Sequence, residues 1–109
     1  MSNEIKWIRL QDICKDIIFR KRQEDISIFL HGSMDLPANL RATVERHGDR
    51  VDLLVNLTYN KGVEDIIKSL AHELAHIVLG RGDECHETRR FVRTFQVLVG
   101  EITDAYEKG

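Results

Sequence analysis

The sequence predicts a small α+β domain, with one helix before three strands and two helices after them. Apolar residues recur at helical spacing near both ends of the chain, and apolar and polar residues alternate in its middle. The 109 residues, of which 42% are hydrophobic and 31% charged, suffice for one core. We therefore expect a single domain over residues 1–109 with a three-stranded, mainly antiparallel sheet.

The first helix is expected over about residues 8–20, and a short strand over residues 26–30 follows it. A basic run at residues 20–22 lies at the C-terminal end of this helix, where cations interact favourably with the helix dipole. The single proline, Pro37, falls in a loop predicted over residues 31–37. The apolar positions of the helix are Trp7, Leu10, Ile13, Ile17 and Ile18.

The next two strands are predicted to form a hairpin. Apolar and polar residues alternate over residues 42–47 and again over residues 51–58, and the pair Gly48-Asp49 separates the two runs. Such a pair between alternating runs is a strong hairpin signal, because glycine adopts the left-handed conformation that tight turns require.

Two helices are predicted in the C-terminal half. The first begins after Gly62, since Glu64 and Asp65 acidify its first turn, and Gly80 ends it. Asp83 is a plausible N-cap for the last helix. The apolar positions are Val63, Ile66, Ile67, Leu70, Leu74, Ile77 and Val78 in the first helix, and Phe91, Phe95, Leu98 and Ile102, widened by Val92, Val99 and Tyr106, in the second.

The first of these two helices contains the sequence His72-Glu73-Leu-Ala-His76. Residues i and i+4 lie on one face of a helix, so both imidazoles can bind one metal ion. Glu73 would project beside them and could act as the general base on a metal-bound water. This spacing is the HExxH signature of zinc peptidases. It predicts Zn²⁺ as the cofactor, His72 and His76 as ligands and Glu73 as the catalytic residue.

The residues around the histidines indicate that they are partly covered. His72 and His76 lie opposite the apolar face of their helix, yet Ala75 and Leu79 beside them are apolar as well. A helix that is apolar nearly all round is a buried helix, and buried imidazoles need partners. A metal ion is one such partner, and ordinary hydrogen bonds are the alternative.

A catalytic zinc site takes three protein ligands and leaves a fourth position for water. The third ligand is expected from the start of the last helix, where His86 and Glu87 are the candidates. Histidine is the better ligand type for zinc, which favours His86. Glu87 lies four residues before Phe91 and so shares the inward face of the helix, which favours Glu87. We take Glu87 as the third ligand and His86 as the alternative.

The motif from His72 to His76, followed by Glu87-Thr-Arg-Arg-Phe91, resembles the gluzincin metallopeptidases and is most similar to the minigluzincins, which are stand-alone catalytic domains. It also resembles ImmA/IrrE-type metallopeptidases and, with His86 as the third ligand, Spartan-type proteases. The resemblance implies a zincin-like fold whose C-terminal helix carries the third ligand. It further implies an endopeptidase that hydrolyses a peptide or protein substrate with a zinc-activated water.

A substrate peptide could add to the sheet as another strand, as zincin-like folds bind peptides. If the strand over residues 51–58 forms the sheet edge beside the cleft, Leu54 and Asn56 are candidate contacts. A non-catalytic zinc-binding or metal-free module that binds a partner protein is the alternative function. A fourth protein ligand would favour that alternative, because structural zinc sites are usually closed.

Composition bears on partners and location. The net charge of −2 lacks the basic surplus of nucleic-acid binders, so no nucleic acid is expected. No stretch has the length and hydropathy of a membrane span, and no secretory signal leads the chain. We therefore expect no membrane association and a cytoplasmic location, with Cys14 and Cys85 as free thiols.

Overall fold

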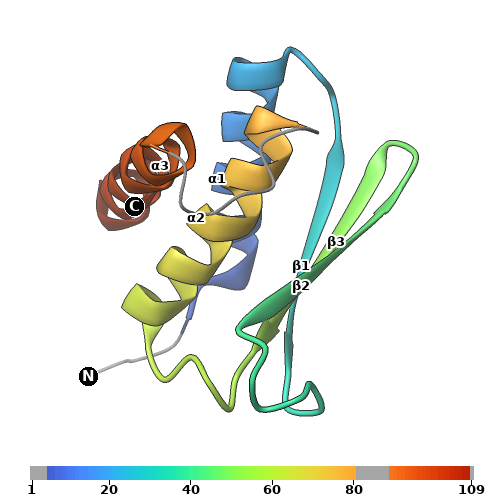
Figure 1. The fold of residues 1–109 in the computed structure, drawn as a ribbon, viewed down its shortest axis with the longest axis vertical. Coiled ribbons are helices and arrows are strands. Elements are labelled where there is room, and N and C mark those ends of the chain that lie inside the picture. Colours follow the sequence, from blue (N-terminus) through green and yellow to red (C-terminus); the bar gives the residue numbers. More distant parts are fainter. Residues whose placement is uncertain (1–4, 81–88, 109) are drawn as a thin grey trace.

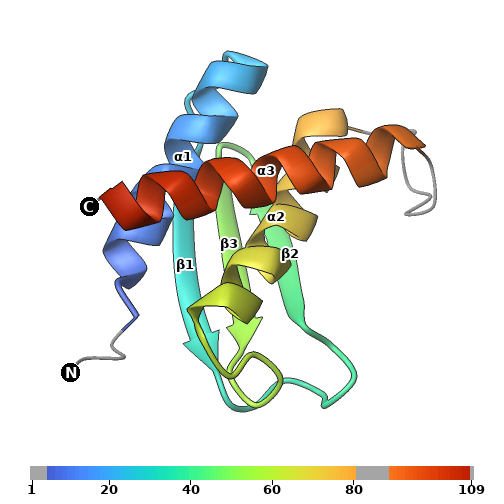
Figure 2. The same cartoon turned by 90° about the vertical axis from the view of Figure 1, so that its left-hand side faces the viewer.

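The computed structural model describes residues 5–80 and 89–108, which form three layers (Figure 1). A three-stranded sheet is the first layer. The helices α1 (Trp7–Arg22) and α2 (Val63–Leu79) pack on one face of the sheet. The last helix, α3 (Arg89–Lys108), crosses both of them on the side away from the sheet (Figure 2). The predicted α+β class and the predicted order of elements are confirmed.

The sheet consists of β1 (Ser27–Ser33), β2 (Ala42–His47) and β3 (Arg50–Asn56), with β3 in the centre. The strands β2 and β3 form the predicted antiparallel hairpin. Its turn requires the backbone freedom of glycine, since Gly48 has a φ of 63°. The strand β1 continues to Ser33, so the loop predicted over residues 31–37 begins only at residue 34.

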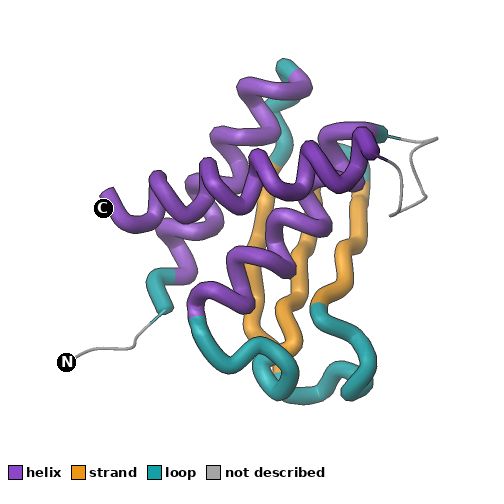
Figure 3. Tube along the Cα trace, turned by 60° about the vertical axis from the view of Figure 1, so that its left-hand side comes forward, coloured by secondary structure: helices purple, strands orange, loops and turns teal. Residues whose placement is uncertain are grey.

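The strand β1 pairs with β3 in parallel, so the sheet is mixed and the expectation of a mainly antiparallel sheet is wrong for this pairing. The connection over residues 34–41 carries the chain past the position of β3 to the far side of the sheet (Figure 3). The hairpin then returns β3 to the centre in the direction of β1. Burial explains this order, because β3 places Val51, Leu53 and Val55 fully in the core, whereas β2 buries only Ala42.

The core lies between the sheet and the two helices that cover it, and it continues between these helices and α3. Each large apolar side chain that is removed from water stabilises the fold by about 1.5–3 kcal/mol. The largest members of this core are Leu10, Ile17, Ile18, Leu53, Ile66, Leu70, Leu74, Leu98 and Ile102, each at most 1% exposed.

The two edges of the sheet differ in what contacts them. On β1, the backbone N–H of Leu30 donates to the Gln11 side chain of α1 at 2.9 Å, so α1 occupies part of that edge. Among the described residues, no strand pairs with the outer edge of β2. The condition that the strand over residues 51–58 forms the sheet edge is not met, because β3 is paired on both sides. Asn56 is fully buried and is not a contact for a peptide.

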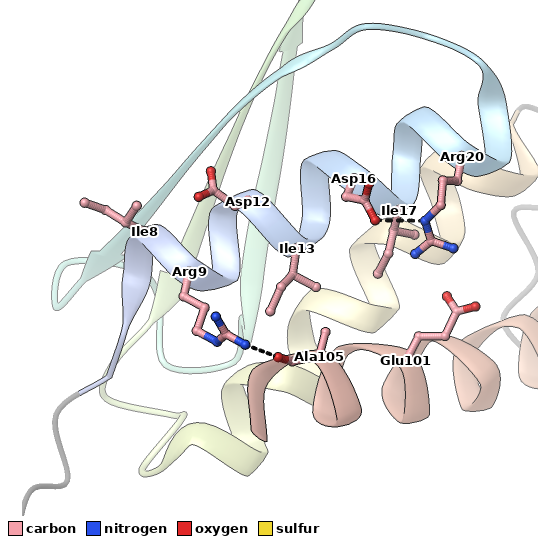
Figure 4. A pocket seen from close by; sticks show the side chains of 9 residues that line it. All are labelled: Ile8, Arg9, Asp12, Ile13, Asp16, Ile17, Arg20, Glu101 and Ala105. Atoms are coloured by element: carbon pink, nitrogen blue, oxygen red, sulfur yellow. Dashed lines mark hydrogen bonds and ion pairs between the residues drawn. The ribbon is translucent and has the colours of Figure 1, made fainter. Parts of the chain in front are cut away.

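Arg9 of α1 ties α3 to the rest of the molecule (Figure 4). Its Nε donates to the backbone oxygen of Tyr106 at 3.1 Å, and its Nη2 donates to the backbone oxygen of Ala105. Both carbonyls belong to the last turn of α3, where intrahelical donors run out. The guanidinium also lies at the negative end of the helix dipole. Arg9 therefore caps α3.

The substitution Arg9→Met is expected to lower the free energy of unfolding by about 1–2 kcal/mol, since it removes two charge-assisted hydrogen bonds and keeps most of the aliphatic stem. Urea titration at neutral pH measures the change. Arg20→Met on the same helix is the control: its partner Asp16, at 2.8 Å, is exposed, so the expected change stays within about 0.5 kcal/mol. Equal losses in the two variants would contradict the capping role.

The buried thiol of Cys14 predicts how the free energy of unfolding depends on pH. Burial raises the pKa of Cys14 from 9.0 to about 12. Above the lower value the unfolded chain releases the thiol proton while the folded chain keeps it, so the free energy of unfolding falls as the pH rises. Cys14→Ala lacks this loss. The stability advantage of the wild type over Cys14→Ala should therefore shrink by about 2 kcal/mol from about pH 8 to about pH 10.5 in urea titrations. A constant difference would argue against a protonated buried thiol.

Candidate metal centre

The helix α2 lies between the sheet and α3, and this position defines the surroundings of both histidines (Figure 1). Leu70 and Leu74 are fully buried in the core. His72 and His76 are half-buried and lie against aromatic side chains of α3. The prediction that this helix is covered on two sides is confirmed.

The two imidazoles lie side by side on α2. Their ring centroids are 5.0 Å apart, and the ring planes make an angle of 74°. Zinc–nitrogen distances of about 2.1 Å with tetrahedral angles bring the centroids of two ligating imidazoles to about 5 Å from each other. The separation of His72 and His76 therefore fits a shared zinc ion, and imidazole nitrogen is a preferred zinc ligand.

Phe91 packs on both imidazoles from α3. Its ring centroid is 5.3 Å from that of His72 and 4.8 Å from that of His76, and the residue is 3% exposed. The Phe95 ring lies 6.4 Å from His72. The predicted inward stripe of the last helix is confirmed at these positions. The first turns of the described helix α3 therefore lie directly beside the histidine pair.

The predicted third ligand, Glu87, and its alternative, His86, lie outside the described residues, as do the candidate cap Asp83 and Cys85. Within residues 5–80 and 89–108, no group of three or more His, Cys, Asp or Glu side chains is placed to hold a metal ion. Of the predicted ligands, the described chain contains His72 and His76, and the choice between Glu87 and His86 stays a prediction.

Glu73 lies next to the histidine pair at a pocket of about 280 Å³. His72, Glu73 and Ser69 of α2 line one side of the pocket, and residues 39–42, which lead into β2, line the other. Burial raises the pKa of Glu73 to about 7. A carboxyl group with such a pKa can both accept and return a proton near neutral pH, as a general base must.

Sequence reasoning missed the wall of this pocket. Neither residues 39–42 nor Ser69 was assigned to the site. The available signal was Ser69 itself, a hydroxyl three residues before His72 and directly before Leu70 of the apolar face, because a buried polar side chain calls for a partner.

A larger pocket of about 390 Å³ lies between α1 and α3 (Figure 4). Its apolar floor includes Ile13 and Ile17. Several charged groups around it are already engaged: Arg9 caps α3, Arg20 pairs with Asp16, and Lys21 pairs with Glu101 at 3.3 Å. The residues that line it include no histidine. The pocket beside Glu73 is therefore the better candidate for a reactive site.

Comparison of the chain with protein-family models, with curated proteins and with solved structures gives no match. Among the described helices, none combines the length and the apolar composition that crossing a membrane requires.

The contact of Phe91 with both imidazoles is expected to be a major part of the α2–α3 interface. Phe91→Ala should lower the free energy of unfolding by about 3–5 kcal/mol, because it opens a cavity beneath α3. Val97→Ala on the same helix is the control: Val97 is 49% exposed, so a change within about 0.5 kcal/mol is expected. Thermal and urea unfolding followed by circular dichroism measure both. A small effect of Phe91→Ala would contradict the packing described.

Proposed function

We propose that this protein is a zinc-dependent metallopeptidase that hydrolyses peptide bonds in a peptide or protein substrate. One arrangement carries the proposal: two imidazoles with centroids 5.0 Å apart lie beside a partly buried carboxyl group that lines a pocket. This is the arrangement that the HExxH spacing predicts. The resemblance of the motif to the gluzincins, above all the minigluzincins, supports the same function.

His72 and His76 would hold the zinc ion, with Glu87 as the third ligand and His86 as the alternative. Phe91 packs on the two imidazoles from the side of α3, and this contact would limit their rotation. Zinc supplies a Lewis acid for the substrate carbonyl and lowers the pKa of a bound water to about 7.

Glu73 would act as the general base. Its carboxyl group takes the proton of the attacking water and returns it to the nitrogen of the departing amine. Partial burial in the pocket raises the pKa of this carboxyl group, which favours uptake of the proton. His72 lines the same pocket, so the base and a metal ligand face the same space.

The outer edge of β2 is the proposed docking place for the substrate backbone. An extended peptide that adds there would form main-chain hydrogen bonds with β2. Residues 39–42 lead into this strand and line the pocket of Glu73, so the added strand would pass beside the reactive carboxyl group. This proposal replaces the earlier expectation for β3, which is paired on both sides. A cytoplasmic place of action fits the free, buried thiol of Cys14.

The first test is the metal content of the untagged protein, measured by elemental mass spectrometry. About one zinc per chain is expected for a mononuclear site. Glu87→Ala is expected to lose the metal while His86→Ala keeps it, and the reverse result would identify His86 as the third ligand. A wild type without zinc, even after zinc is supplied at neutral pH, would overturn the proposal.

Cleavage of a peptide library by the zinc-loaded protein is the second part of the test. Glu73→Gln is the matched control, because it keeps the shape of the side chain and removes its basicity. It should retain the zinc and lower the cleavage rate by about 10²–10⁴-fold. Zinc binding without cleavage by the wild type would favour the alternative, a non-catalytic zinc-bearing interaction module.

A further inference from the structure

The buried polar side chains of the described chain belong to one network rather than being scattered through the core. They are Asn56, Asn60 and Ser69, each at most 3% exposed. The Ser69 hydroxyl donates to Oδ1 of Asn60 at 2.7 Å, and Nδ2 of Asn60 donates to the backbone oxygen of Asn56 at 2.8 Å. Burial of such groups is costly unless each is satisfied, and a satisfied network gives a unique, rigid arrangement.

The same network holds the segment that precedes β2. Nδ2 of Asn56 donates to the backbone oxygens of Pro37 and Leu40, at 3.1 and 2.7 Å. The backbone oxygen of Arg41 accepts from Nδ2 of Asn60 and from the backbone N–H of Asn56, both at 2.9 Å. Four hydrogen bonds to three carbonyls therefore fix residues 37–41.

The network spans the pocket of Glu73 from one wall to the other. Ser69 lies on α2 three residues before His72 and four before Glu73, which is about one helical turn. Residues 39–42 line the opposite side of the pocket. The path from Ser69 through Asn60 to Arg41 thus links the helix of the reactive residues to the facing wall.

We propose that Ser69, Asn60 and Asn56 are positioning residues that fix residues 37–41 opposite Glu73 and thereby set the substrate-binding wall of the site. This inference rests on the proposed peptidase function. A wall that loses its link to α2 would move relative to Glu73 and to the start of β2. Substrate binding would weaken, while the chemistry on a bound substrate would continue.

The test is Ser69→Ala, which removes one hydroxyl and introduces the residue with the best helix propensity. The substrate is the fluorogenic peptide that the zinc-loaded wild type cleaves best in the library. Ser69→Ala is expected to keep the zinc content and to raise KM about tenfold, with kcat within about twofold. Ser69→Thr restores the hydroxyl and should restore KM.

Gln11→Met is the matched control, because it also removes a bond between a helical side chain and a backbone group, at the β1 edge. Its KM should equal that of the wild type. Amide hydrogen exchange, measured by NMR, gives a readout that needs no substrate. In Ser69→Ala, the amide of Asn56, whose acceptor is the Arg41 carbonyl, should exchange faster than in the wild type and in Gln11→Met.

Cleavage by the wild type with an unchanged KM in Ser69→Ala would overturn this inference and leave the proposed function intact. So would a loss confined to kcat, or a KM that Ser69→Thr fails to restore. Absence of cleavage by the zinc-loaded wild type would overturn the proposed function and this inference with it. Asn60→Asp, which keeps the shape and removes the donor to Arg41, should reproduce the rise in KM.

Discussion

The burial of α2 on two sides is the constraint on which the rest of the structure depends. One side of this helix completes the core above the sheet, and the other lies under α3. On its covered faces, such a helix can carry a polar side chain only where a neighbouring group contacts it. Phe91 packs on the imidazoles, and Asn60 accepts from Ser69. The same burial raises the pKa of Glu73. Packing and candidate chemistry therefore have one cause.

The order of the strands brings to this helix the edge of the sheet that pairs with no described strand. Because the hairpin returns β3 to the centre, β2 lies at the edge away from β1, and residues 39–42 reach the side of α2 that bears Glu73. At the opposite edge, Gln11 of α1 occupies the backbone of β1. The two edges are thus unequal, and within residues 5–80 and 89–108 the one without a partner strand leads to the pocket of His72 and Glu73.

Local pattern was enough to predict the helices and the hairpin, because amphipathic spacing and turn residues report which face of an element is buried. It was not enough to predict that β1 pairs in parallel with β3, since alternation reports a buried face and not a neighbour. The polar network could not be predicted either, because local pattern does not report which distant residues are in contact. Asn56 is 16 residues from the carbonyl of Leu40 that it binds, and nothing near Asn56 in the sequence indicates this partner. The histidine pair could be predicted because His72 and His76 lie four residues apart on one helix.

The placement of Glu73 bears on whether the histidine pair serves catalysis or structure. A structural zinc site is closed by four protein ligands and requires no free carboxyl group. Here a carboxyl group is partly buried next to the pair, which disfavours its charged form and so opposes folding at neutral pH. It also faces a pocket of about 280 Å³ whose far wall four hydrogen bonds hold in place. A metal-bearing interaction module could use the pocket to bind a partner but would not require the carboxyl group. A hydrolase requires both, since the base must meet a water and a substrate in one enclosed space.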